Sequence, residues 1–128
     1  MKQDLALLAL RFSGGFLMLY LHGWKKLVGW AQLKNTFPDP LGIGSQLSLA
    51  GTIFTEVFCA LFIILGIATR YASIPLIFTM LVAVFIVHGP DPMAKKELGL
   101  VFLTIYIALW AYGGGQLGLD RFIKKLKN

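Results

Sequence analysis

Ionisable residues interrupt the most apolar parts of this sequence. Arg11, His22 and Lys26 lie in the apolar run 4–28, and Glu56 lies near the middle of the next run. At about 100° per residue, the first three share one helical stripe roughly 80° wide. A charged side chain inside a membrane segment costs about 2.5–3.5 kcal/mol on insertion scales and nearly always faces the bundle interior, a partner or water. The stripe is therefore expected to point inward.

Four ionisable residues are candidates for a ligand site. His22 ends the first apolar run, with Lys26 just beyond it, His88 ends the third run and Glu97 opens the fourth. If all four runs cross a membrane, consecutive runs are antiparallel, and these residues reach one face. Imidazoles and carboxylates can exchange protons, and ligand pockets often form between the helices of bundles. The sequence therefore predicts a ligand site formed by His22, Lys26, His88 and Glu97.

An intramembrane ion pair is expected between Arg11 and Glu56. At about 1.5 Å per residue, Arg11 lies roughly 10 Å, and Glu56 roughly 15 Å, from the side that holds the termini. The long arginine side chain can close that gap. A purely structural role is the alternative for each of these residues. The Arg11–Glu56 pair could simply tie two helices together, and His22 or His88 alone is typical of a hydrogen-bonding residue near the membrane interface.

The composition sets the class of protein. With 57% hydrophobic and 14% charged residues and a mean hydropathy of +0.74, the 128-residue chain is too apolar for a soluble domain. Its apolar runs are each near the roughly 20 residues that cross a bilayer, and they cover residues 4–28, 46–67, 71–88 and 96–112. We expect an all-α integral membrane four-helix bundle forming a single domain over residues 1–128. The first run is expected to be a retained helix and not a signal peptide.

The polar segments indicate lipid contacts. Residues 31–45, which are rich in proline and glycine, form the longest connection and could cap the bundle. Residues 119–127 form a basic amphipathic tail suited to a membrane surface. The net charge of +6 lies mostly at the segment ends, which favours anionic lipid headgroups over nucleic acid. Lysine and arginine are slightly more numerous on the side of the termini, which favours a multi-pass protein with both termini in the cytoplasm.

The sequence contains no redox centre of its own. A single cysteine, Cys59, rules out an internal disulfide. His22 and His88 could together ligate a haem iron, but the chain has neither the Cys-x-x-Cys-His of covalent haem attachment nor the Glu-x-x-His of di-iron bundles. Noncovalent haem is the less favoured alternative, and no protein-bound metal is expected.

The order and spacing of these residues resemble the DoxX family of small four-helix bacterial membrane proteins. The features that carry the resemblance are Arg11 with Gly15, His22-Gly23-x-x-Lys26-Leu27, Glu56, Leu65-Gly66-x-x-Thr69-Arg70, His88, Glu97 and Gly115-x-x-x-Leu119-Asp120. The resemblance implies a protein of the bacterial cytoplasmic (inner) membrane. It also implies a superfamily that includes subunits of thiosulfate:quinone oxidoreductase, with some members tied to sulfur or thiol redox and oxidative-stress systems.

We therefore expect this chain to bind a quinone or a similar amphipathic molecule at the His22, His88 and Glu97 end. It would then be the membrane component of a quinone-linked oxidoreductase, with a partner protein supplying any metal or flavin. Quinone chemistry needs hydrogen-bond donors and a path for protons, which these side chains can provide. The alternative is a non-catalytic assembly or small-solute transport module. Either function is compatible with a homo-oligomer.

Overall fold

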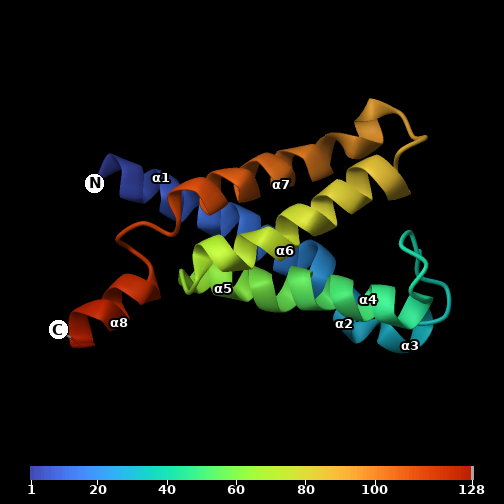
Figure 1. Ribbon diagram of the computed structural model, residues 1–128, viewed down its shortest axis with the longest axis horizontal. Coiled ribbons are helices and arrows are strands. Elements are labelled where there is room, and N and C mark those ends of the chain that lie inside the picture. Colours follow the sequence, from blue (N-terminus) through green and yellow to red (C-terminus); the bar gives the residue numbers. More distant parts are fainter. Residues whose placement is uncertain (128) are drawn as a thin grey trace.

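Four long helical rods and a short terminal helix make up the part of the chain that the computed structural model describes, residues 1–127 (Figure 1). The first rod contains α1 (Lys2–Phe12), η1 (Ser13–Leu17), η2 (Leu19–Gly23) and α2 (Trp24–Val28), and α3 (Trp30–Leu33) follows it. The second rod contains α4 (Ser45–Ile53), η3 (Phe54–Cys59) and α5 (Ala60–Leu65), and the third contains α6 (Thr69–Val82) and η4 (Ala83–Val87). The fourth rod is α7 (Met93–Tyr112), and the short terminal helix is α8 (Leu119–Lys127). No strand occurs in residues 1–127. The predicted all-α membrane bundle is confirmed.

Three rods are long and apolar enough to cross a membrane: Lys2–Val28, Ser45–Leu65 and Thr69–Val87. The fourth, α7, has 20 residues but begins with Lys95, Lys96 and Glu97 in its first turns. A helix of that length spans about 30 Å, so its charged start would lie at one edge of the hydrocarbon layer. Many apolar side chains on the outside of the rods are exposed, as lipid contact requires.

The segments labelled η1 to η4 are π-helical and interrupt the first three rods. A wider turn inside an α-helix shifts the direction of the side chains that follow, and such segments are frequent at functional sites. Glu56 lies within η3, and His88 directly follows η4. The periodicity of a regular α-helix does not predict these turns.

Glycines bring the first two rods into backbone contact. A Cβ atom on Gly15 would lie 2.9 Å from the carbonyl oxygen of Ala60, and one on Gly23 would lie 2.5 Å from that of Glu56. Small residues allow this close approach between membrane helices. The contact at Gly23 holds the Glu56 turn directly against the first rod.

The bundle core also ties the fourth rod to the first. Tyr106 of α7 is fully buried, and its hydroxyl donates a hydrogen bond of 2.8 Å to the carbonyl oxygen of Gly14. Both termini, the α5–α6 turn, the end of α7 and α8 lie at one end of the molecule, and the segment that joins α3 to α4 lies at the other (Figure 1). These two ends hold the two cavities described below.

Candidate functional site

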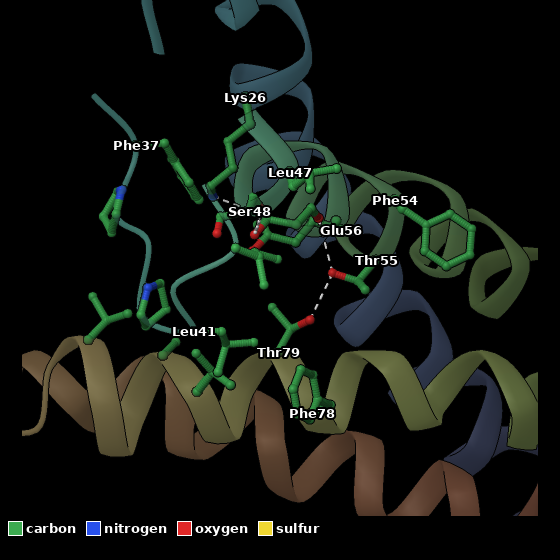
Figure 2. Close-up of a pocket in the computed structure, with 18 of the residues that line it drawn as sticks. Lys26, Phe37, Leu41, Leu47, Ser48, Phe54, Thr55, Glu56, Phe78 and Thr79 are labelled. Atoms are coloured by element: carbon green, nitrogen blue, oxygen red, sulfur yellow. Dashed lines mark hydrogen bonds and ion pairs between the residues drawn. The ribbon is translucent and has the colours of Figure 1, made fainter. Parts of the chain in front are cut away.

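A cavity of about 490 Å³ lies between the segment 34–44, the second rod and the third rod. Figure 2 shows side chains converging on it from these elements. Its walls are mostly apolar, and its lining residues are Lys26, Phe37, Pro38, Pro40, Leu41, Ile43, Leu47, Ser48, Gly51, Thr52, Phe54, Thr55, Glu56, Phe78, Thr79, Val82, Ala83, Val87 and His88. The cavity falls within the 300–1,000 Å³ range of ligand pockets.

An ion pair of Lys26 and Glu56 forms the charged part of this wall. Lys26 Nζ lies 2.7 Å from Glu56 Oε1, and Glu56 is only 5% exposed. The glutamate comes from η3 and the lysine from α2, which are the parts of rods one and two that Gly23 brings together. Removing either partner would leave a buried charge unpaired, which is strongly unfavourable.

Threonine hydroxyls form the other polar part of the wall. Thr55 Oγ1 donates to the carbonyl oxygen of Thr52 at 3.0 Å and lies 3.0 Å from Thr79 Oγ1 of the third rod. Thr79 Oγ1 also lies 2.8 Å from the carbonyl oxygen of Pro75. Because each hydroxyl has one proton and two lone pairs, the two threonines link rods two and three and keep capacity to accept a further hydrogen bond.

Asp39 fixes the segment that covers the cavity. Its carboxylate accepts hydrogen bonds from the backbone N–H of Ile43 at 2.9 Å and of Gly44 at 2.8 Å, and from the Ser48 hydroxyl at 2.9 Å. These bonds, led by the one from Gly44, hold the pKa of Asp39 below its ordinary value. The carboxylate thus joins the proline-containing wall to the first turn of α4.

His88 lies where the third rod ends, and its ring is held by a carboxylate. Its Nδ1 is 2.8 Å from Asp91 Oδ2. The hydrogen bond with His88 is the main reason that the pKa of Asp91 is lowered. A fixed Nδ1 partner orients the imidazole, and His88 is among the residues that line the cavity.

Comparison with known proteins identifies the family. The DoxX family profile matches residues 6–89. This chain belongs to the DoxX family. The match includes every residue that lines the cavity. Family membership and the three apolar helices together support a membrane location for this DoxX protein.

An uncharacterized protein of Haemophilus influenzae (strain ATCC 51907 / DSM 11121 / KW20 / Rd) is 26% identical to this DoxX protein over 128 residues. The alignment covers 94% of this chain and 85% of the relative. No solved structure gives a significant match. The similarity thus extends beyond the family match into α7, but it adds no activity.

The structure brings together two of the four residues predicted to form the ligand site. Lys26 and His88 line the cavity, whereas His22 and Glu97 are not among its lining residues. His22 packs edge-on against the ring of Phe102 in α7, with ring centroids 5.8 Å apart, and Glu97 is exposed. The shared stripe was calculated for a regular α-helix, but the first rod contains η1 and η2 between Arg11 and Lys26. Wider turns change which side chains share a face.

The predicted ion pair between Arg11 and Glu56 was wrong. Glu56 pairs with Lys26, while Arg11 donates to three backbone carbonyls: Nε to Ile63 at 3.0 Å, Nη2 to Ile64 at 2.9 Å and Nη1 to Gly114 at 3.2 Å. Ile63 and Ile64 lie in the last turn of α5, where the final carbonyls form the negative end of the helix dipole. That end stabilises the buried guanidinium without a carboxylate, and the group keeps its positive charge.

Proposed function

We propose that this DoxX protein binds a quinone, or another amphipathic molecule of similar size, in the cavity between segment 34–44 and rods two and three. The observation that carries the proposal is the ion pair between partly buried Lys26 and buried Glu56 in the wall of a largely apolar cavity of about 490 Å³. Pockets for small molecules combine mostly apolar walls with a few placed polar groups. This cavity has that composition.

The polar groups suit a ligand that carries carbonyl or hydroxyl oxygens. The Lys26 ammonium has three N–H donors, and its hydrogen bond to Glu56 uses one of them. A further N–H of Lys26 can donate to a ligand oxygen. The hydroxyl oxygens of Thr79 and Thr55, whose protons are already donated within the protein, can accept a hydrogen bond from a ligand hydroxyl. A quinone supplies two carbonyl oxygens that take up protons on reduction, and Glu56 and Lys26 together can hold or release a proton beside them.

The exposed part of the wall supports entry from the bilayer. Leu47, Phe54 and Phe78 line the cavity and are 65%, 54% and 55% exposed. All three belong to rods long and apolar enough to span a membrane. A hydrophobic ligand dissolved in the lipid would therefore reach the cavity sideways, past apolar side chains.

The proposed setting is a sulfur, thiol or oxidative-stress redox system. In this setting the chain is a single-domain, multi-pass protein of the bacterial inner membrane with cytoplasmic termini, and a partner protein supplies the electron-transfer centre. Family membership supports the membrane location, and the cavity supports ligand binding. The rival proposal, a non-catalytic assembly or transport module, needs no quinone site.

Native mass spectrometry of the purified full chain, titrated with decylubiquinone, tests the proposal. We expect binding of one molecule per chain and a loss of affinity of about tenfold or more in Lys26→Met, since a charge-assisted hydrogen bond is removed. The matched control is Lys25→Met, which removes the same charge from the neighbouring exposed residue. The double variant Lys26→Met/Glu56→Gln leaves no unpaired buried charge and should also bind weakly. Equal affinity in Lys26→Met and Lys25→Met, or no binding by the unaltered chain, would favour the assembly module.

A further inference from the structure

A second cavity, of about 590 Å³, lies at the opposite end of the bundle. The start of the first rod, the α5–α6 turn, the glycine-rich segment after α7 and the start of α8 form its walls. Figure 1 shows these elements together at the end that holds both termini. Its lining is mostly polar, whereas that of the first cavity is mostly apolar, so it is suited to a polar ligand.

Two arginines that line this cavity make no side-chain contact with a hydrogen-bonding partner in residues 1–127. Arg70 and Arg121 line it, are exposed, and form no hydrogen bond or ion pair through their side chains within residues 1–127. The carboxylates beside them are engaged by backbone groups. Asp4 accepts from the Gln116 N–H at 2.9 Å, and Asp120 accepts from the Ala68 N–H at 2.6 Å. Both carboxylates are thus held by the backbone, whereas the two guanidinium groups have all their N–H donors available to a ligand.

Thr69 adds a buried hydroxyl that lacks a partner. It is 4% exposed, lines the same cavity, and its Oγ1 makes no hydrogen bond within residues 1–127. A buried polar group without a partner is unfavourable, so its persistence points to a ligand atom that completes it. Thr69 is also the first residue of the 14-residue helix α6, whose N-terminal N–H groups favour an anion.

A third positive charge, that of Arg11, lies behind the cavity wall. A Cβ atom on Gly66, which lines the cavity, would lie 2.8 Å from Arg11 Nη2. The buried guanidinium of Arg11 therefore lies directly behind the wall and contributes positive potential in a region that screens charge poorly. Its hydrogen bonds go to backbone carbonyls and not to a carboxylate.

We propose that this cavity binds a phosphate group held by Arg70, Arg121 and the Thr69 hydroxyl, and that the phosphate belongs to an anionic phospholipid headgroup. Arginine recognises phosphate through parallel N–H···O bonds. The neighbouring helix α8 supports a lipid as the source, because its exposed apolar side chains Phe122 and Ile123 and its several lysines are typical of a helix lying in the membrane interface. Such a helix places the cavity at headgroup depth.

Native mass spectrometry of the full chain with added phosphatidylglycerol tests this site. We expect one tightly held phosphatidylglycerol and a loss of affinity of about tenfold or more in Arg70→Gln/Arg121→Gln. The control Lys124→Gln/Lys125→Gln removes the same charge from α8 residues outside the cavity and should stay within about twofold. Thr69→Val keeps the side-chain shape and should also weaken binding.

Three results would overturn the proposal. Equal losses in the two double variants would mean that total charge alone attracts the lipid. Equal retention of phosphatidylcholine would mean that the net negative charge of the headgroup is not what the site recognises. Displacement of phosphatidylglycerol by millimolar inorganic phosphate would make a soluble anion the ligand in place of a lipid.

Discussion

Lys26 Nζ lies 2.7 Å from Oε1 of Glu56, so the buried carboxylate of the second rod is paired with the far end of the first rod. Gly23, three residues before Lys26, packs on the backbone of Glu56 itself. The backbone contact and the ion pair therefore stabilise the same joint. The candidate ligand cavity lies beside this joint, and its polar wall depends on it.

The pair should show strong coupling in a double-mutant cycle. Lys26→Met or Glu56→Gln alone should lower the free energy of unfolding, by about 3–5 kcal/mol where one charge stays buried without its partner. The double variant should recover part of that loss. Equilibrium unfolding in mixed detergent micelles measures the three values, and losses that simply add would contradict the pairing. Lys25→Met, at an exposed position, should change stability by no more than about 0.5 kcal/mol.

Arg11 should behave independently of Glu56. Arg11→Met removes three hydrogen bonds to backbone carbonyls and should destabilise by a few kcal/mol, since hydrogen bonds to charged groups contribute about 1.5–3 kcal/mol each. Combined with Glu56→Gln, the two losses should add within about 0.5 kcal/mol because the residues share no partner. A coupling above about 1 kcal/mol in the same unfolding assay would restore the direct pair expected from the sequence.

Two glycines of the helical rods should respond to alanine in opposite directions. Gly23→Ala places a Cβ 2.5 Å from the backbone oxygen of Glu56, which cannot move freely, so a loss of about 1–3 kcal/mol is expected. Gly51→Ala meets nothing within 4 Å and should gain up to about 0.5–1 kcal/mol from lower backbone entropy in the unfolded chain. Thermal unfolding of both variants tests this; a neutral Gly23→Ala would mean that the rods can separate at this point.

Acid should release the segment over the ligand cavity. The folded protein lowers the pKa of Asp39, so the stabilisation is fully present above the unfolded pKa of about 3.9 and is lost as the pH falls through the lower folded value. The protection of residues 39–48 from hydrogen exchange, corrected for the pH dependence of the intrinsic exchange rate, should therefore fall below about pH 4. Asp39→Asn should exchange faster at neutral pH and lose most of this pH dependence. Unchanged protection of the unaltered chain at low pH would contradict the role of Asp39.

The sequence predicted the architecture because hydrocarbon leaves an apolar run of about 20 residues few choices besides a helix. The candidate site could be predicted less fully. Counting residues along an ideal helix places a side chain approximately in depth, and Lys26 and His88, expected at the same end of the bundle, both line the cavity there. Such counting does not locate π-helical turns. These turns occur in the rods where His22 was expected at the cavity and where Glu56 was expected to pair with Arg11.

The contribution of Asp39 was missed, although a local signal exists. An aspartate before Pro40, followed by Gly42 and Gly44, is the pattern of a side chain that accepts hydrogen bonds from its own turn. The partners of Arg11 had no such signal. Backbone carbonyls at the end of a helix carry no residue identity, so only the packed structure shows that they receive the guanidinium.

Every residue that lines the candidate ligand cavity falls between positions 26 and 88, and α7 begins at Met93. During translation, all of these residues leave the ribosome before the fourth rod does. The cavity walls can therefore assemble from three consecutive rods while α7 is still being made. The later arrival of α7, which packs along α6 and ties Tyr106 to Gly14, would lock a site whose parts are already in the membrane.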